Sequence, residues 1–420
     1  MREMKDSGLD WLRDVPVAWR FAALKRLYSQ ISETGCETED LLSVYLHYGV
    51  IRYRDSDGTQ VHKPSKKLDK YQMVTPGNFV LNNQQAWRGS VGVSSYHGIV
   101  SPAYYVLAKI SDCIDDRFAN YLFRGPFRQV FELCSNGIGT IQRNLSLSKL
   151  MAEKVPLPPL DEQRRIADYL DEKCAEIDRA ISAAEQSIEE YKAYKNSVIF
   201  QAVTKGLDKR AAMVDSGVEW LGEVPRGWVV RYPKFLFSAR RERARAGDVM
   251  LTASQHHGMI PQKQFMEKEA YVPAPVEKGK DILKHVEPGD FVISMRSFQG
   301  GLEYSELRGK MSSAYLALYP VSDSVVSTYY RWLFKSPRYI QGLRSTTNLV
   351  RDGQALRYAN FLKLWLPLPP VNEQIRIAEY LDQKCPQIDS AIAAKLAIIA
   401  DLKAYKQSLI YEVVTGKREV

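Results

Sequence analysis

The chain has 420 residues, of which 45% are hydrophobic, and it carries a formal net charge of +9. That length exceeds one ordinary domain, and five cysteines without a CxxC pair argue against both a disulfide framework and a zinc site. No apolar run approaches the roughly 18 residues that cross a bilayer, and the chain does not begin with the apolar segment of a signal peptide, so we expect a cytoplasmic protein without a membrane partner.

The first motif along the chain is repeated about 210 residues later. Asp6-Ser-Gly-Leu-Asp-Trp-Leu12 returns as Asp215-Ser-Gly-Val-Glu-Trp-Leu221. The proline and tryptophan that follow the first copy also return after the second, as Pro16 and Trp19 and then as Pro225 and Trp228. Because self-similarity at a fixed period indicates a repeated architecture, we expect the chain to be one unit written twice.

The middle of each unit, residues 20–150 and 230–360, is rich in Tyr, Val and turn residues. Short runs between Pro and Gly turns predict strands at Asn78–Leu81, Tyr104–Leu107 and Asp290–Ile293. Helices are predicted at Arg117–Phe123 and Tyr329–Lys335. Each middle is therefore predicted to be a mixed α/β domain.

Each unit ends in a segment that is nearly the same in both copies. Residues 155–174 match residues 366–385 at fourteen of twenty positions. Paired prolines end the preceding strand, and Asp161 and Asn372 are favoured helix N-caps. We expect a short helix after each cap and a break before the next helix, which Pro386 marks in the second copy.

The following helix has apolar positions spaced alternately by four and three residues, which predicts a coiled-coil seam in both copies. The seam residues are Ile177, Ile181, Ala184, Ile188, Tyr191, Lys195, Val198 and Ala202, then Ile388, Ile392, Lys395, Ile399, Leu402, Lys406, Leu409 and Val413. The matched lysines Lys195 and Lys406 either set the register or extend off an imperfect seam into water. About 28 residues of helix span roughly 42 Å, slightly more than the roughly 34–36 Å of one DNA turn.

These patterns predict an α/β (α+β) fold, in which two mixed α/β domains are joined by long antiparallel coiled-coil helices and related by a pseudo-two-fold internal repeat. The predicted boundaries are 1–155 for the first domain, 156–205 for a central helical region, 206–366 for the second domain and 367–420 for a C-terminal helical region.

Patterns of catalytic chemistry are missing from the sequence. Gly416-Lys417 lacks the first glycine of a phosphate-binding loop, and Gly137-Ile-Gly139 lacks the third glycine of a dinucleotide site. Pro156-Leu-Pro-Pro159 lacks the leading Asp or Asn and the aromatic residue of an amino-methyltransferase motif. The histidines form no HxxxH pair. We therefore predict no catalytic, cofactor-binding or metal-binding residue.

Positive charge lies outside the repeated helices. Between Asp161 and Lys195 there are ten acidic and six basic residues, a net charge of −4, so the remaining chain carries about +13. Long cations contact DNA phosphates, whereas Arg, Asn and Gln make paired hydrogen bonds to base edges. The candidate DNA-contact residues, each of which also fits a solvated surface loop, are Arg52, Arg54, Lys63, Lys66, Lys67, Asn83, Gln84, Gln85, Arg88, Arg143, Arg240, Arg241, Arg243, Gln255, His256, Arg296, Gln299, Arg351 and Gln354.

Taken together, these motifs resemble the specificity (S) subunit of type I restriction–modification systems. The resemblance covers the whole chain and is carried by the segments Asp6–Trp19, Asp215–Trp228, Pro156–Ile166 and Pro367–Ile377, and by the Lys-Ala-Tyr-Lys helices. It implies two target-recognition domains, each specific for one half of a bipartite, asymmetric site in double-stranded DNA. It also implies that the helices set the spacer and dock two methylation (M) subunits.

The same resemblance implies that this chain is not an enzyme and binds no cofactor itself. The methylation subunits would supply S-adenosylmethionine and flip out the target adenine, and restriction (R) subunits would complete the complex, with ATP and Mg as further cofactors of these partners. Two alternatives stay open: a stand-alone DNA-binding regulator, and a fused methyltransferase or nuclease, which would need a catalytic motif. The recognition domains vary across the family, so the contact residues above come from physical reasoning alone.

Overall fold

The structure is a computed structural model that describes residues 2–46, 48–56, 64–65, 67–137, 143–269, 282–294, 297–346 and 357–420. No helix within these ranges is long and apolar enough to span a membrane. By its contacts the chain divides into two compact units, which we call unit 1 (Met1–Ala184 with Ala397–Val420) and unit 2 (Glu185–Leu396). Each unit holds one mixed α/β domain together with parts of both long helices.

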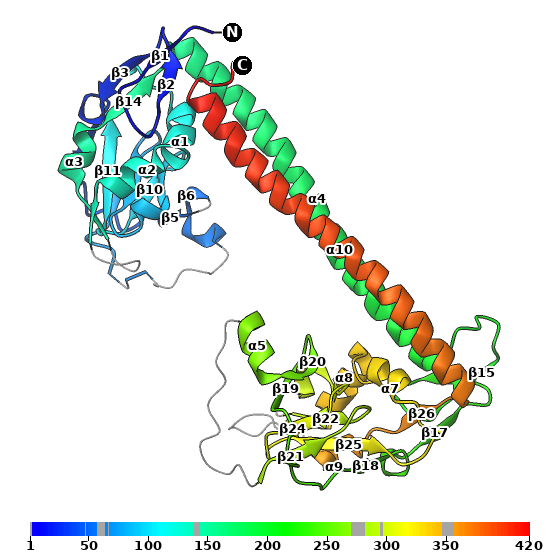
Figure 1. Ribbon diagram of the computed structural model, residues 1–420. Helices are drawn as coiled ribbons and strands as arrows, with labels where there is room; N and C mark the ends of the chain where they lie inside the picture. The colour runs from blue at the N-terminus through cyan, green and yellow to red at the C-terminus, as the bar shows by residue number, and fades with distance from the viewer. Residues whose placement is uncertain are drawn as a thin grey trace. The chain divides into compact units, whose positions relative to one another are not determined.

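Both units are built on the same antiparallel four-stranded sheet (Figure 1). In unit 1 the strand order is β4 (Tyr28–Ile31), β11 (Tyr104–Lys109), β8 (Phe79–Asn82) and β9 (Val91–Val93). In unit 2 it is β18 (Phe237–Ala239), β25 (Leu316–Pro320), β22 (Phe291–Ile293) and β23 (Glu303–Tyr304). The register is also repeated, because Val80 pairs with Gly92 and Val292 with Glu303. The predicted strands are confirmed.

Antiparallel strand pairs surround each sheet. Those of unit 1 are β1 (Met4–Asp6) with β2 (Asp14–Pro16), β3 (Arg20–Ala23) with β14 (Lys154–Leu157), β5 (Leu42–Tyr45) with β6 (Gly49–Arg52), β7 (Gln72–Val74) with β10 (Gly98–Val100), and β12 (Ser135–Asn136) with β13 (Asn144–Leu145). Those of unit 2 are β15 (Met213–Asp215) with β16 (Glu223–Pro225), β17 (Val229–Arg231) with β26 (Leu366–Leu368), β19 (Leu251–Ser254) with β20 (Gly258–Pro261), and β21 (Lys284–Val286) with β24 (Gly309–Met311).

Short helices pack against these sheets. Unit 1 has α1 (Asp116–Arg124), α2 (Arg128–Leu133) and α3 (Leu147–Ala152), with 3-10 turns η1 (Leu24–Arg26), η2 (Tyr53–Asp55) and η3 (Ala86–Arg88). Unit 2 has α5 (Gln262–Glu269), α6 (Ser297–Gly300), α7 (Ser327–Leu333), α8 (Pro337–Ser345), α9 (Tyr358–Phe361) and the 3-10 turn η4 (Pro233–Phe235). Helices α1 and α7 confirm the two that the sequence predicted.

Aromatic side chains bind the first helix of each unit to its sheet. In unit 1 Phe79 of β8 stacks on Phe123 of α1, with ring centroids 4.3 Å apart. In unit 2 Phe291 of β22 meets Phe334 edge-on at 4.9 Å, just after the end of α7. All four rings are fully buried, so each fixes how the helix and its flanking loops lie on the sheet.

The repeated tails form two unbroken helices, α4 (Leu160–Lys205) and α10 (Val371–Val414), of 46 and 44 residues. The predicted break is therefore wrong: Pro386 lies inside α10. Pro386 is exposed, while Cys385 and Ile388 beside it are buried, and this burial offsets the roughly 3 kcal/mol that an interior proline costs.

The predicted caps also need correction. Both helices begin two residues earlier than N-caps at Asp161 and Asn372 would require, so these are the second residues of α4 and α10. The backbone N–H groups of Glu162 and Gln163 instead donate to the carbonyl oxygen of Pro159, at 2.9 and 3.0 Å. Pro370 accepts the equivalent pair in α10. Proline suits this entry position because its fixed φ precedes the first turn without needing a donor.

Within each unit, α4 and α10 lie side by side and run in opposite directions (Figure 1). Every predicted seam residue is buried or half-buried, whereas most residues between them are exposed, so the seam is confirmed. The matched lysines reach across it. Lys406 donates to Asp178 at 2.6 Å in unit 1, and Lys195 donates to Asp389 at 2.6 Å in unit 2. Of the two roles considered for these lysines, the structure favours register setting.

A buried glutamine joins each domain to its helix. The Gln163 amide donates to the carbonyl oxygens of Cys113 and Pro158 and accepts from the backbone N–H of Asp115. Gln374 makes the same three bonds with Ser324, Pro369 and Val326. The adjacent carboxylate is also repeated, because Glu162 accepts from the Trp19 indole and Glu373 from the Trp228 indole. The motif residues that recur in both copies therefore form the joint.

Candidate nucleic-acid interface

In unit 1, the turn of the β5–β6 hairpin meets the segment that follows β8. The Ser90 hydroxyl donates to the carbonyl oxygen of Val44 at 2.7 Å, next to the turn. A Cβ placed on Gly89 would lie 3.6 Å from the Leu46 side chain. Gly89 ends η3 with a φ of 104°, a left-handed conformation that glycine adopts without strain. The hairpin turn and residues 82–88 thus share one end of the unit.

Residues 82–88 contain four of the candidate DNA-contact residues, Asn83, Gln84, Gln85 and Arg88, and local hydrogen bonds determine the conformation of this polar segment. The Asn82 side chain accepts from the backbone of Gln84 at 3.1 Å. The Asn83 side chain accepts from the backbone of Leu145 at 3.0 Å, so its amide oxygen holds β13. Gln84 is exposed and Gln85 half-buried.

Two predicted contact residues stack on one tryptophan. The guanidinium carbons of Arg88 and Arg143 lie 4.9 and 4.7 Å from the centre of the Trp87 ring. The Trp87 indole N–H donates to the carbonyl oxygen of Gln84, which fixes the ring. Although they are 55 positions apart in sequence, the two arginines are therefore held together on an aromatic support. The sequence placed Trp87 inside the segment but gave no sign of this role.

Unit 2 brings its candidates together in the same manner. Gln255 and His256 form the turn of the β19–β20 hairpin, where the Ser254 hydroxyl accepts from the backbone of His256 at 3.3 Å. Gln299 lies in α6, which occupies the place of η3, and both Gln255 and Gln299 are exposed. A Cβ on Gly300 would come within 2.8 Å of the Gln255 side chain, so α6 and the turn are in close contact.

Among the described residues, the first basic cluster contains Arg52, Arg54 and Lys67. It begins at the end of the β5–β6 hairpin that is opposite the turn. Arg52 pairs with Leu42 there, and its side chain lies 3.5 Å from Asp40 and over the Tyr96 ring. Arg54 lies 3.4 Å from the same carboxylate and is 63% exposed. Lys67 is exposed.

In the second basic cluster, Arg240 is committed to internal contacts. It donates twice to Asp290, at 2.6 and 2.9 Å, donates once to Glu242, and stacks on Tyr319. We therefore do not include Arg240 in the proposed DNA surface. Arg241 and Arg243 are exposed.

An acid–base network lies beneath this cluster in unit 2. Fully buried His285 has Nδ1 2.7 Å from an Asp248 oxygen and Nε2 2.7 Å from a Glu287 oxygen. A hydrogen bond from His285 lowers the pKa of Glu287. Within the described ranges, no group of three or more His, Cys, Asp or Glu side chains is placed to hold a metal ion.

Five candidates, Lys63, Lys66, Arg296, Arg351 and Gln354, lie outside the described residues. Their DNA contacts stay predictions.

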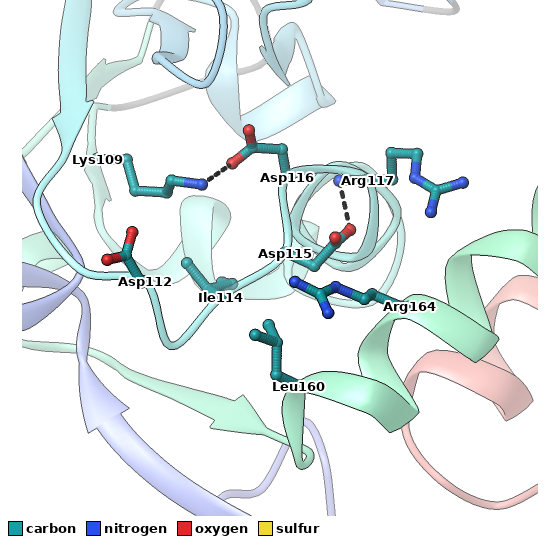
Figure 2. A pocket seen from close by; sticks show the side chains of 8 residues that line it. All are labelled: Lys109, Asp112, Ile114, Asp115, Asp116, Arg117, Leu160 and Arg164. Atoms are coloured by element: carbon teal, nitrogen blue, oxygen red, sulfur yellow. Dashed lines mark hydrogen bonds and ion pairs between the residues drawn. The ribbon is translucent and has the colours of Figure 1, made fainter.

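Each unit also has a polar cavity where its sheet meets its first helix. The cavity of unit 1, of about 440 Å³, lies between β11, α1 and the start of α4 (Figure 2). Lys109 pairs with Asp116 at 2.6 Å, and the Asp115 carboxylate caps α1 by accepting from the backbone of Arg117. The cavity of unit 2, of about 450 Å³, lies at the equivalent junction. Because these polar side chains pair with one another or cap the helix, we interpret both cavities as structural features of the repeated domain.

Comparison with known proteins finds one family model that matches part of the chain. Residues 30–190 match the model of the type I restriction modification DNA specificity domain. Residues 30–190 are therefore similar to the domain of this family. The resemblance seen in its motifs is thereby confirmed.

A curated relative extends the match. The chain is 23% identical over 293 residues to the putative type I restriction enzyme MjaX specificity subunit of Methanocaldococcus jannaschii. The aligned part covers 66% of this chain and 62% of that relative, so less than two thirds of the relative is matched.

Two solved structures confirm the predicted fold class of two mixed α/β domains with long helices. A chain from a study of complex assembly and conformational transition of the type I R-M system matches with a TM-score of 0.70 at 17% identity, covering 96% of this chain and 99% of that one. The HsdS subunit from Thermoanaerobacter tengcongensis matches with a TM-score of 0.52 at 17% identity, covering 96% and 98%.

Proposed function

We propose that this chain is the DNA-recognition subunit of a type I restriction–modification complex and performs no chemistry itself. One observation carries the proposal: the four-stranded sheet of the domain that matches the specificity-domain model in residues 30–190 occurs again in unit 2, and the two copies carry different side chains at the same end. Trp87, Arg88 and Arg143 occupy this place in unit 1, and Gln255, His256 and Gln299 in unit 2. Different side chains on one frame imply two half-sites of different sequence.

The loops supply the chemistry that base recognition requires. Arginine makes paired hydrogen bonds to guanine, and glutamine or asparagine makes them to adenine, in the major groove. Arg88 and Arg143 are held on Trp87, so little conformational freedom remains to be lost on binding. The exposed cations Arg54, Lys67 and Arg241 would contact phosphates and give salt-dependent affinity.

The helices α4 and α10 would set the spacer between the half-sites and dock two methylation subunits. Their support is the unbroken helix in each copy and the lysine–aspartate pair that crosses the seam in each unit. The methylation subunits would bring S-adenosylmethionine, and restriction subunits would bring ATP and Mg. The complex would act in the cytoplasm.

Mapping methylated adenines in cells with and without this gene tests the proposal. We expect one bipartite motif to lose its modification when the gene is deleted, and an unchanged methylation map would refute the proposed function. Replacing residues 20–150 with the corresponding segment of another such chain should then change one half-site only. A change in both halves would contradict the assignment of one half-site to each unit.

A heptad insertion tests the spacer separately. Seven residues inserted between Glu189 and Glu190, exposed residues of α4, should lengthen the spacer or abolish methylation while both half-sites keep their sequence. An altered half-site would contradict the role of the helices. Tight, specific binding by the purified chain alone would instead favour the stand-alone regulator.

A further inference from the structure

A cation that the sequence did not single out lies beneath the hairpin turn of each unit. Arg124 is the last residue of α1, and Lys335 follows α7 by two residues. They occupy equivalent positions of the repeat, in Leu122-Phe123-Arg124 and Leu333-Phe334-Lys335. The aromatic residue before each is fully buried, so the backbone that carries the cation is fixed.

Lys335 connects three separate segments of unit 2. Its ammonium group donates to the carbonyl oxygen of Gln255 in the hairpin turn at 3.4 Å and to that of Gly300 in α6 at 3.0 Å. It also pairs with the Glu303 carboxylate of β23 at 2.7 Å. The side chain is only 28% exposed and Glu303 is buried, so water does not readily replace the pair with Glu303, whereas the longer bond to the Gln255 carbonyl oxygen is exposed.

Glycines allow these three segments to approach one another closely. A Cβ on Gly258 would lie 2.9 Å from the carbonyl oxygen of Tyr304, and one on Gly301 would lie 1.9 Å from that of Phe334. Both glycines have positive φ angles, of 67° and 79°. The turn, the α6 segment and β23 therefore pack backbone to backbone around the Lys335 ammonium group.

Arg124 has the corresponding place in unit 1. A Cβ on Gly49, directly after the hairpin turn, would lie 3.2 Å from Nε of Arg124. A Cβ on Gly92 of β9 would lie 3.1 Å from the backbone nitrogen of Val50. Burial lowers the pKa of Arg124, which reflects how far the guanidinium is withdrawn from water. The hairpin of unit 1 thus lies against a half-buried arginine and against β9.

We propose that Arg124 and Lys335 are positioning residues for DNA recognition, each of which holds the hairpin turn of its unit against the neighbouring loop. This inference rests on the proposed function. Base recognition by paired hydrogen bonds requires side chains in one arrangement, and loops held by a half-buried cation keep that arrangement before DNA arrives. At the register of Glu303, unit 1 has Gly92.

The test replaces the gene by a Lys335→Met variant in the native cells and maps methylated adenines at cognate sites and at sites with one mismatch. We expect mismatched sites in the unit 2 half to gain modification about tenfold or more relative to cognate sites, because one mismatch normally costs about 1–3 kcal/mol of binding. Sites with a mismatch in the other half-site should stay unmethylated. Lys335→Arg should behave as the wild type, because it keeps a positive charge with N–H donors and unit 1 has an arginine, Arg124, at the equivalent position.

Two further variants separate positioning from stability. Lys335→Met leaves Glu303 buried without its cation, so we combine it with Glu303→Gln. The double variant should regain thermal stability but should still methylate mismatched sites in the unit 2 half. Tyr329→Phe removes a buried hydrogen bond to the carbonyl oxygen of Val203 elsewhere on α7, and it should lower stability while leaving both half-sites intact.

The outcomes distinguish this inference from the proposed function. If the wild-type gene produces no bipartite motif, the proposed function fails and the inference fails with it. If the motif is present but Lys335→Met discriminates as the wild type does, only the positioning role is overturned. An equal loss of discrimination in both half-sites would also overturn it, because a positioning residue acts on its own unit.

Discussion

The joint between domain and helix gives a quantitative prediction through Gln163. Gln163→Leu keeps the approximate size of the side chain and removes all three of its hydrogen bonds, at 2.8, 2.9 and 2.8 Å. The carbonyl oxygen of Pro158 is buried in its bond, so losing the donor costs about 1–3 kcal/mol. Cys113 is exposed and Asp115 half-exposed, so water can replace those bonds and each costs about 0.5–1 kcal/mol. The sum is about 2–5 kcal/mol.

Urea unfolding followed by tryptophan fluorescence measures this loss. We expect Gln163→Leu to lower the midpoint of the transition that reports on unit 1, and Gln374→Leu to do the same for unit 2. Gln129→Leu, at an exposed position of α2, is the matched control and should change the free energy of unfolding by less than about 0.5 kcal/mol. A loss below about 1 kcal/mol for both buried glutamines would refute their role as the joint.

Three further predictions concern charged groups. In a double-mutant cycle of Lys195→Met and Asp389→Asn, measured by urea unfolding, the coupling free energy should be only about 0.5–1 kcal/mol, because Asp389 is 54% exposed. A coupling free energy of zero would mean that the pair does not set the register. Burial raises the pKa of Glu303 to about 7, although Lys335 opposes this. The folded protein therefore binds a proton at Glu303 more tightly than the unfolded chain does. The stability that this proton provides is complete below the ordinary pKa of 4.5 and is lost as pH rises through 7. Relative to Glu303→Gln, the free energy of unfolding of the wild type should therefore fall by about 3 kcal/mol over that range. Parallel pH profiles of the two proteins would exclude the shift. The lowered pKa of Glu287 acts in the opposite direction, because the stability that its carboxylate provides is present above pH 4.5 and is lost on acidification. In thermal melts, His285→Gln should therefore lose less stability on acidification than the wild type does. An unchanged acid profile would contradict the role of His285.

The sequence predicted the frame because the frame is repeated. The seam periodicity, the strands at Phe79 and Phe291 and the helices that carry Phe123 and Tyr329 follow from local patterns that occur twice. The errors lie at helix ends. Pro386 reads locally as a helix start, but the seam on both sides of it favours one continuous helix.

The candidate interface was only partly predictable. The polar segments after β8 and β22 were found from composition, since residue types that hydrogen-bond to bases are visible in a sequence. Long-range partners were not. Arg240 looks like any surface arginine until Asp290 is seen 2.6 Å away, and Arg143 joins Arg88 only through Trp87. Lys335 was read as the end of a helix, and its partners lie 32 to 80 positions away in the chain.

The two units differ most where the proposed function requires it. Their joints use the same side chains, because Gln163 and Gln374 each bridge three backbone groups and the carboxylates after Pro159 and Pro370 each hold a tryptophan. Their loops share backbone positions but not side chains. A joint that changed would alter how the loops face DNA, whereas a loop that changes on a fixed joint alters only which bases it can bind. A change of target in one half-site is therefore least costly when confined to the hairpin turn and the segment after β8 or β22.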